Sequence, residues 1–330
     1  MATLTLAAAI NAGLRKAMER DPKVLIMGED VGVLGGVFRV TDGLFKDFGA
    51  ERVMDTPLAE AGIVGTAIGM AMRGYTPVCE IQFDGFIFPA FNQITTQLAK
   101  LHYRSHGKIT LPVVIRVPFA GGIGAVEHHS ESPEVLFAHT PGLRVVSPAT
   151  PQDGFTMIQQ AIASPDPVLF FEPKARYWDK AEVDVDAPFD SAGATAGMCH
   201  AQIARLGDDV TIVAYGPTVR VALQAAQVLE KEGLSAEVID LRSISPLDHG
   251  SVVRSVKKTG RCVVVHEAVT AFGVGAEVAA RVAEEAFFHL EAPILRVGGF
   301  YMPYPGAKFE HDYLPSVDRV LDAVDRVLAH

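Results

Sequence analysis

Short runs rich in β-forming residues alternate with segments of helical length along almost the whole chain. Strands that alternate with helices are typical of a parallel sheet covered by helices. The β-rich runs are residues 23–30, 76–83, 111–118, 143–148 and 167–173, followed by 209–216, 236–241, 261–268 and 292–297. Helical patterns such as residues 217–232 separate them. We therefore expect an α/β protein.

The length of the chain and one break in this pattern indicate two domains. A chain of 330 residues exceeds one ordinary core, and 49% of its residues are hydrophobic, enough for large cores. Near Glu172 the alternation stops, and residues 171–197 are rich in Asp, Pro, Gly and Ala, as connections between domains are. We predict a larger N-terminal domain with a parallel sheet over residues 1–185, a linker over 186–204 and a smaller α/β domain over 205–330.

Composition and charge argue against several kinds of partner. The formal net charge is −10 without a dense Lys/Arg run, which disfavours nucleic acid or an anionic membrane as the main partner. No segment approaches the roughly 18 apolar residues of a membrane span, and the N-terminus lacks a basic segment ahead of its apolar one. Cys79, Cys199 and Cys262 are isolated, without a CxxC pair, which fits a reducing compartment. We expect a soluble cytoplasmic protein.

Glu60 is an isolated carboxylate at the head of twelve uncharged residues. Thr56 and Pro57 predict a helix that has Thr56 as its N-cap and Pro57 as its first residue. Glu60 then falls one place beyond the position where a capping box needs Glu or Gln. Two interpretations stay open: a carboxylate that favours the positive end of a helix dipole, or a functional group in apolar surroundings.

A glycine-rich loop, residues 121–134, follows the predicted strand at 111–118 and brings Glu127, His128 and His129 together. Ligands gather at the carboxyl ends of strands in open parallel sheets. Glycines would let the backbone approach such a ligand, and histidine suits proton transfer near neutral pH. The alternative is a turn with two solvated histidines.

Other motifs are weaker. Residues 272–278 resemble a dinucleotide fingerprint but lack its third glycine. His102 and His106 lie four apart on a predicted helix and could share a metal, yet no acidic third ligand is near, so two surface histidines are the preferred interpretation. Neither a GxSxG elbow nor a GxxxxGK[ST] phosphate loop occurs.

Six motifs, taken in their order and spacing, resemble the beta subunit of the decarboxylating component of 2-oxo acid dehydrogenase complexes. They are DTPLAEAG, EIQFDGFIFPAFNQ, HHSESPEVLFAHTPGLRVVSP, PVLFFEPK, VIDLRSISPLD and VVVHEA. The match runs from about Lys23 to the C-terminus, and residues 28–39 and 129–139 look more like the branched-chain type than the pyruvate type. The resemblance implies a thiamine diphosphate enzyme with a transketolase-like pyrimidine-binding domain and a C-terminal domain.

The resemblance also implies roles for several residues. Glu60 matches the glutamate that hydrogen-bonds N1′ of the cofactor's aminopyrimidine and favours the imino tautomer, which takes the proton from thiazolium C2. Burial suits such a carboxyl group because it disfavours the charged form. Leu58, Gln82 and Phe86 match positions that line the aminopyrimidine pocket, although some relatives have tyrosine in place of Phe86.

The histidine of HSES, His129, matches an active-site histidine that handles protons during acyl transfer to a lipoyl sulfur. The family often has HSQ, so Glu131 is a departure that adds a carboxylate, and His128 has no matching role. Several relatives bind a structural potassium ion through backbone carbonyls and an Asp. The positions that match this potassium site are Leu111, Val113, Val114, Ala161, Ser164 and Asp166.

The resemblance implies that half of the cofactor site lies on another chain. Thiamine diphosphate enzymes hold the diphosphate through a divalent metal bound by GDG and a later NN, and neither motif occurs here. An alpha subunit would then bind magnesium and the diphosphate, in an α2β2 heterotetramer that serves a lipoylated acyltransferase core. Gly62, Gly65 and Gly69 suit helix packing across a subunit boundary, although a core helix inside one subunit would look the same.

The preferred hypothesis is the beta subunit of a branched-chain 2-oxo acid dehydrogenase. One alternative keeps the enzyme and changes the substrate to pyruvate or acetoin. Another is a non-catalytic subunit that only scaffolds a complex, and the presence of both Glu60 and His129 counts against it.

Overall fold

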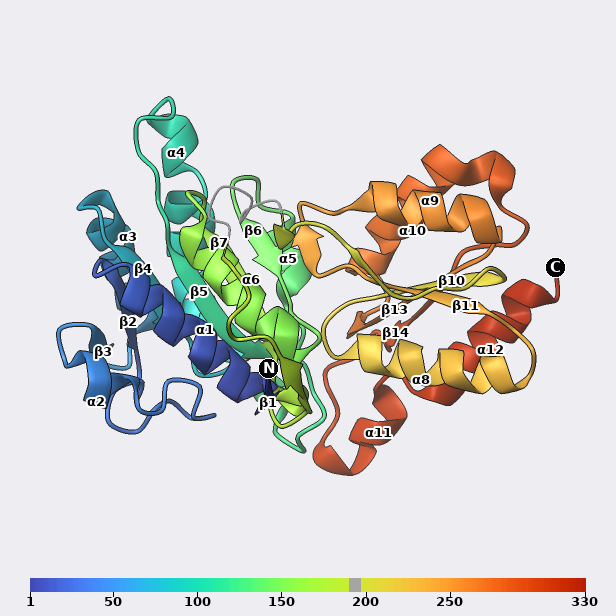
Figure 1. Ribbon diagram of the computed structural model, residues 1–330. Helices are drawn as coiled ribbons and strands as arrows, with labels where there is room; N and C mark the ends of the chain where they lie inside the picture. The colour runs from blue at the N-terminus through green and yellow to red at the C-terminus, as the bar shows by residue number, and fades with distance from the viewer. Residues whose placement is uncertain (190–196) are drawn as a thin grey trace.

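Every β-rich run expected from the sequence forms a strand, and the strands fall into two main sheets. The computed structural model describes residues 1–189 and 197–330, which form two α/β lobes side by side (Figure 1). The expected two-domain α/β fold is therefore confirmed. The predicted linker, residues 186–204, lies partly outside the described residues, so its boundaries stay a prediction.

The larger sheet belongs to the N-terminal lobe and has seven strands. In spatial order they are β12 (Ser243–Ser245), β6 (Arg144–Val146), β7 (Val168–Pro173), β5 (Val114–Phe119), β4 (Thr76–Glu80), β2 (Val24–Gly28) and β3 (Val53–Asp55). All neighbours pair in parallel except β12, which is antiparallel to β6. The carboxyl ends of β2, β3, β4 and β5 thus open on one edge.

Helices cover both faces of this sheet because its strands are apolar on both sides. In β7, Leu169 and Phe171 join one core while Val168 and Phe170 join the other. The second core also holds α1 (Leu6–Arg20) and α6 (Pro151–Ala163), which pack against each other. The opposite face is covered by α3 (Glu60–Met72), the 3-10 helix η1 (Asp84–Ala90) and the π-helical turn η2 (Gln93–Leu98).

The C-terminal lobe repeats this plan with five strands. Their order is β14 (Leu295–Gly299), β13 (Cys262–Val269), β10 (Val210–Ala214), β11 (Ala236–Asp240) and β9 (Gln202–Arg205), and β9 alone is antiparallel. Figure 1 shows α9 (His249–Thr259) and α10 (Val274–Ala286) on one face, and α8 (Thr218–Lys231) and α12 (Val317–Leu328) on the other. The helix expected at 217–232 is therefore confirmed.

The remaining short helices lie in connections. They are α2 (Leu44–Phe48), α4 (Leu101–Arg104), α5 (Glu134–Ala138) and α11 (Glu310–Tyr313), with 3-10 turns η3 (Glu127–His129), η4 (Lys174–Arg176), η5 (Phe287–His289) and η6 (Ala307–Phe309). A two-stranded antiparallel ribbon joins β1 (Ala2–Thr5) to β8 (Lys180–Val183).

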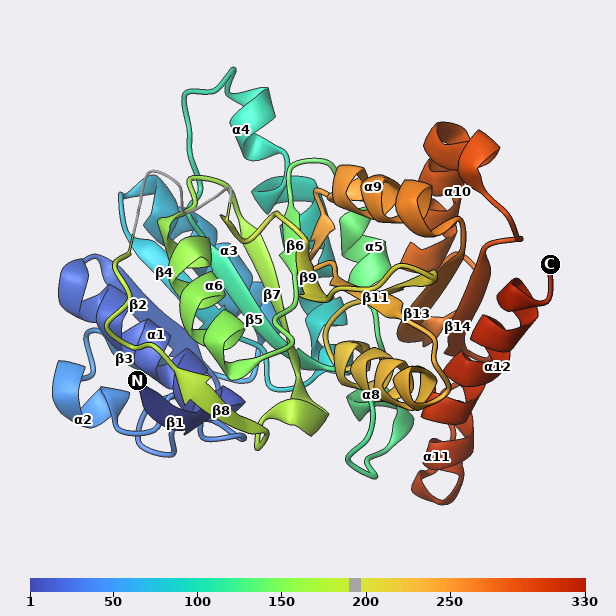
Figure 2. The same ribbon diagram turned by 45° about the vertical axis from the view of Figure 1, so that its right-hand side comes forward.

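The two lobes share structure rather than merely touching. One hydrophobic core includes Phe119 and Phe171 of the first lobe together with Val213 and Val264 of the second. In addition, β12 follows β11 of the smaller sheet but pairs with β6 of the larger one (Figure 2). A segment that the sequence places in the C-terminal domain therefore completes the N-terminal sheet.

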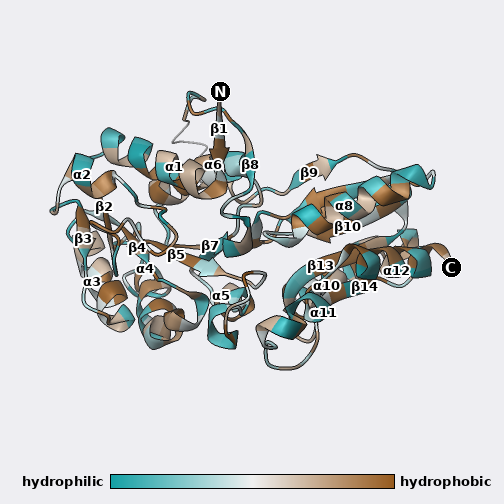
Figure 3. Ribbon diagram, turned by 90° about the horizontal axis from the view of Figure 1, so that it is seen from below, coloured by the Kyte–Doolittle hydropathy of each residue, from teal (hydrophilic) through white to brown (hydrophobic). Residues whose placement is uncertain are grey.

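Apolar strands lie between more polar helix surfaces, as Figure 3 shows by hydropathy. Among the described residues, no helix is both long and apolar enough to cross a membrane. Cys79 and Cys262 are fully buried, and burial raises the pKa of each thiol to about 12. They pack as small apolar side chains, as expected.

Candidate active site

Glu60 is the first residue of α3 and is buried, with 6% of its surface exposed. The helix was expected to begin at Pro57, and that prediction is wrong, since the N-cap is Ala59. The Thr56 N–H donates to the Gly28 carbonyl at 2.9 Å, which extends the pairing of β2 with β3. The segment before Glu60 is thereby held extended, so Glu60 stands directly at the positive end of the helix.

Glu29 is the carboxylate that the sequence interpretation overlooked. It follows β2, is 6% exposed, and neither carboxylate oxygen has a hydrogen-bond partner within residues 1–189 and 197–330. Burial, then the charges of Glu60 and Asp30, raises the pKa of Glu29. Buried polar groups without partners are costly and rare, so this pair of carboxylates indicates a site completed by another group. The GED that ends the strand at 23–30 was the available signal.

Two of the predicted pocket residues lie around these carboxylates. The Gln82 amide Nε2 donates to Asp30 Oδ2 at 3.0 Å, which ties it to the loop that carries Glu29. Phe86 lies on η1, and η1 packs against α3, the helix of Glu60. Leu58 is 79% exposed in the loop before α3 and lacks packing partners of the kind its size calls for.

His129 lies beside Phe86 and Phe83. Its ring stacks on Phe83 at 4.0 Å between centroids and meets the edge of Phe86 at 5.0 Å. Its Nδ1 is 3.0 Å from the His128 carbonyl oxygen, so the tautomer protonated at Nδ1 would leave Nε2 free. His129 therefore contacts Phe86 on η1, which packs against the helix of Glu60, and Gln82 is bonded to the loop that carries Glu29.

The face of α3 beyond Glu60 is uncovered. Gly62, Gly65 and Gly69 are exposed, and no other part of the described chain comes within 4 Å of where a Cβ of Gly65 or Gly69 would stand. A cavity of about 410 Å³ opens at the start of this helix, beside Met54, Thr56 and neighbouring residues. This helix face is therefore not part of a core inside the chain.

The residues present fit only half of thiamine diphosphate. A buried carboxylate, an amide and an aromatic ring suit an aminopyrimidine, and the unpartnered Glu29 oxygens mark a place for a missing group. Within residues 1–189 and 197–330, no cluster of three or more His, Cys, Asp or Glu side chains could hold a metal.

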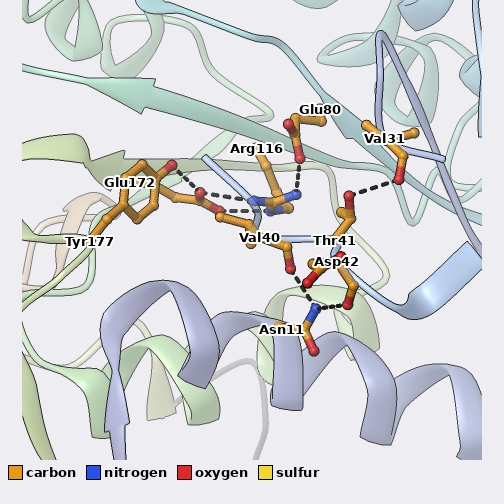
Figure 4. A network of polar contacts seen from close by, with 9 residues as sticks. All are labelled: Asn11, Val31, Val40, Thr41, Asp42, Glu80, Arg116, Glu172 and Tyr177. Carbon is orange, nitrogen blue, oxygen red and sulfur yellow. Dashed lines mark hydrogen bonds and ion pairs between the residues drawn. The ribbon is translucent and has the colours of Figure 1, made fainter. Parts of the chain in front are cut away.

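A second group of buried charges lies at the same sheet edge but is fully paired (Figure 4). Arg116 contacts Glu80 Oε2 through Nη1 at 2.6 Å and both oxygens of Glu172 at 2.7 and 2.9 Å. The Tyr177 hydroxyl donates to Glu172 at 2.5 Å. Burial lowers the pKa of Arg116, but the charges of Glu172 and Glu80 outweigh it and the net change is upward. This network serves the fold.

The glycines of the loop at 121–134 have a different use from the one expected. The backbone N–H groups of Gly121, Gly122 and Gly124 donate to carboxylates of the C-terminal lobe, at 2.8, 2.8 and 3.0 Å. The acceptors are Glu267 for the first and Glu310 for the other two. The close approach that glycine permits is thus made by the other lobe, not by a ligand.

Two weaker motifs have structural explanations. Helix α4 ends at Arg104, and His106 follows in a turn with φ +52°, so His102 and His106 do not share a helix face. A Cβ on Gly273 or Gly275 would lie 2.7 Å from the ring of buried His266. The glycines of 272–278 therefore admit a histidine ring and do not form a dinucleotide loop.

The residues that match a potassium site gather where β5 and β7 begin and α6 ends. Several of their oxygens already accept hydrogen bonds, among them the carbonyls of Leu111, Val113 and Ala161. The Asp166 carboxylate is paired with the Arg144 guanidinium at 2.8 Å. Potassium at this place stays a prediction.

Two protein-family models together match most of this chain. The family "Transketolase, pyrimidine binding domain" matches residues 2–179, and "Transketolase, C-terminal domain" matches residues 199–320. A solved structure, "Split gene transketolase, inactive beta4 tetramer", is 25% identical with a TM-score of 0.80 and covers 99% of this chain and 98% of its own.

Two curated relatives span nearly the full length. "Pyruvate dehydrogenase E1 component subunit beta" of Leifsonia xyli is 61% identical over 99% of this chain and 96% of the relative. "3-methyl-2-oxobutanoate dehydrogenase subunit beta" of Mycobacterium tuberculosis is 51% identical over 99% and 92%. The higher identity falls on the pyruvate type, so these matches do not support the preference for the branched-chain type. This chain belongs to the family of beta subunits of the E1 component of 2-oxo acid dehydrogenases, which are thiamine diphosphate-dependent decarboxylating enzymes.

Proposed function

We propose that this chain supplies the aminopyrimidine half of a thiamine diphosphate site in a 2-oxo acid dehydrogenase. The observation that carries the proposal is the buried pair Glu60 and Glu29 at an edge where Glu29 has no partner of its own. Glu60 would share a proton with the pyrimidine N1′, because a carboxylate within hydrogen-bond reach of a ring nitrogen can accept its proton and return it. Gln82, Phe86 and Leu58 would orient the ring.

When bound, the cofactor supplies the carbon nucleophile that adds to the ketone of the 2-oxo acid and retains the electron pair as carbon dioxide leaves. His129 would then move a proton at the lipoyl disulfide that accepts the acyl group. Its ring is held between Phe83 and Phe86 and can present Nε2 to an incoming group. Glu60 and His129 are therefore assigned to different steps.

An alpha subunit would complete the site. Two features support it: exposed Leu58 and the uncovered glycine face of α3. Magnesium and the diphosphate would lie on the alpha subunit, within an α2β2 assembly that delivers acyl groups to a lipoylated acyltransferase core.

Pyruvate is the first substrate to test, because the relative with 61% identity is named for it. The second is 3-methyl-2-oxobutanoate, the branched-chain acid in the name of the relative with 51% identity. Both are 2-oxo acids and differ in the volume of the acyl group, so a pocket built by two subunits can discriminate between them.

The test is carbon dioxide release from both acids by the chain co-purified with its alpha subunit, beside calorimetry on the chain alone. We expect turnover only in the assembly, and no tight binding of thiamine diphosphate with magnesium by the isolated chain. Micromolar or tighter binding without a partner would contradict the shared site. Absence of carbon dioxide release from any 2-oxo acid by the assembled enzyme would favour the scaffolding alternative.

A further inference from the structure

The segment that carries His129 is a closed loop, residues 121–130, which we call the histidine loop. Its base is closed by the Ala120 N–H, which donates to the Glu131 carbonyl at 2.9 Å. The Glu131 N–H donates in turn to Asp84 Oδ2 at 2.7 Å, and the Lys174 ammonium pairs with the other oxygen of Asp84. The second arm is thus fixed by the N-terminal lobe through a fully buried ion pair.

The first arm is held from the other lobe. Glu310, the first residue of α11, accepts from the Gly122 N–H with Oε1 and from the Gly124 N–H with Oε2. Glu267 of β13 accepts from the Gly121 N–H. Glu310 is only 4% exposed, so these charge-assisted bonds are shielded from water.

The glycines of this arm are needed for that contact. A Cβ on Gly121 would lie 1.9 Å from the Tyr304 hydroxyl oxygen, and Gly122 and Gly124 have φ of +89° and +69°, where side chains are strained. The Tyr304 hydroxyl donates to Glu310 Oε1 at 2.7 Å. The glycines at these three positions therefore allow this arm to pack closely against the C-terminal lobe.

The histidine is held by bonds within its loop and by the packing of η3, the turn that carries it, against η1. The His129 N–H donates to the Val126 carbonyl at 3.0 Å, inside the loop, and its Nδ1 faces the His128 carbonyl. Outside the loop, aromatic contact with Phe83 and Phe86 locates the ring. The positions of the two arms of the histidine loop therefore contribute to the position of the His129 ring.

We propose that Glu310 is a positioning residue for acyl transfer: from the C-terminal lobe it fixes the glycine arm of the histidine loop and thereby the place of His129. This inference rests on the proposed role of His129. Glu310 begins α11 in the C-terminal lobe and does not line the cavity at the start of α3, so its removal separates the two steps of the reaction.

The experiment compares two activities of the assembled enzyme. Decarboxylation coupled to a soluble oxidant, ferricyanide, needs Glu60 but no lipoyl group, whereas acylation of an isolated lipoyl domain needs both. In Glu310→Gln an amide NH2 faces a backbone N–H, so at least one bond to the loop is lost. We expect acylation to fall between about tenfold and a hundredfold and decarboxylation to stay within about twofold.

Tyr304→Phe is the matched control, because it removes the hydroxyl bond to Glu310 but leaves both carboxylate oxygens on the loop. It should keep both activities. Hydrogen exchange adds a readout of position: amides of the histidine loop should exchange at least about tenfold faster in Glu310→Gln than in the wild type and Tyr304→Phe. Equal loss of both activities in Glu310→Gln, or no loss of either, would overturn the inference.

His129→Ala, assayed in parallel, separates this inference from the proposed function. If that variant acylates normally, the proposed role of His129 fails, and the exchange of the loop alone then decides whether Glu310 holds it. If Glu310→Gln does not assemble with the alpha subunit, Glu267→Met removes the acceptor of the Gly121 N–H, and the same criteria apply to this variant. A selective loss of acylation supports the inference, and an equal or absent loss refutes it.

Discussion

Two groups of buried carboxylates stand at the same edge of the larger sheet, and they differ in whether the chain itself satisfies them. Glu80 and Glu172 share Arg116, whose five N–H donors fit two carboxylates. Glu29 directly follows the neighbouring strand β2 and Glu60 begins α3, and the Glu29 carboxylate has no hydrogen-bond partner among the described residues. Gly28 is paired directly with Glu80 in the β2–β4 ladder, so the two groups are neighbours.

The difference separates a structural use of buried charge from a functional one. A buried charge persists in a stable fold only if it is paired or if the cost serves a purpose. The Arg116 network is complete within one chain, so its role can be internal. Among the described residues the Glu29–Glu60 pair is incomplete, as is expected of a site that a bound group would complete.

The largest effect on stability is expected when Arg116 is replaced. Arg116→Met would leave Glu80 and Glu172 buried and unpaired, which should lower the free energy of unfolding by about 3–5 kcal/mol. Arg15→Met is the control, since the Arg15–Asp47 pair at 2.7 Å is solvent-exposed and should cost about 1 kcal/mol or less. Urea unfolding of both variants measures this. Similar losses would mean that the Arg116 network is no more structural than a surface pair.

The next prediction concerns the Glu29–Glu60 pair and changes activity rather than stability. Glu60→Gln keeps a hydrogen-bonding side chain but cannot share a proton with the cofactor, so decarboxylation by the assembled enzyme should fall by about a hundredfold or more. Thermal stability and cofactor affinity should change little. Glu51→Gln, an exposed neighbour in the sequence, should keep full activity. Near-normal turnover in Glu60→Gln would remove Glu60 from the catalytic step.

The unpartnered carboxylate itself predicts a pH dependence. The pKa of Glu29 is raised above its ordinary value of 4.5, so ionising it costs stability as the pH rises through the interval between the two values. In the isolated chain, Glu29→Gln should therefore raise the melting temperature at pH 8, by less than about 3 °C, and should have no effect at or below pH 4.5. The control Glu19→Gln, at an exposed position, should leave the melting temperature unchanged at both pH values. A lower melting temperature at pH 8 would show that ionised Glu29 has a partner.

The smallest expected effect concerns potassium. If the carbonyls near Leu111 and Ala161 bind the ion together with Asp166, replacing NaCl with KCl should raise the melting temperature of the chain by about 1–3 °C. Asp166→Asn should abolish the difference while the overall fold persists. An equal melting temperature in both salts would leave Asp166 as the partner of Arg144 only.

Long apolar runs were predictable because they carry their own signal. The strands at 76–83 and 261–268 form as expected. Each is buried on both faces of its sheet and is therefore mostly apolar along its length, which makes it recognisable in the sequence. The short edge strands β1, β3, β8, β9 and β12 were missed. Three or four residues give too little pattern, and their pairing partners lie far away in the sequence. The start of α3 was misplaced for the same reason: the pairing of Thr56 with Gly28 overrides a good local capping signal.

Within the site, Glu60 and His129 stood out in the sequence because their neighbours are unlike them. A charged residue before an apolar helix and paired histidines after glycines are local contrasts. Glu29, Glu267 and Glu310 carry no such contrast, because each is one acidic residue among many in a chain with 39 of them. Their importance comes from burial and from what they face.

By itself, the sequence determined the α/β class, the two-domain order and the family, because periodicity and motif order are properties of the chain, and it suggested Glu60 and His129 as site residues. Tertiary structure alone decided which carboxylates are paired. Whether Glu80 meets Arg116, whether Glu29 is left without a partner, and whether Glu310 reaches Gly122 depend on segments far apart in the chain. Hydrogen bonds act over about 3 Å, so only the folded arrangement can assign them.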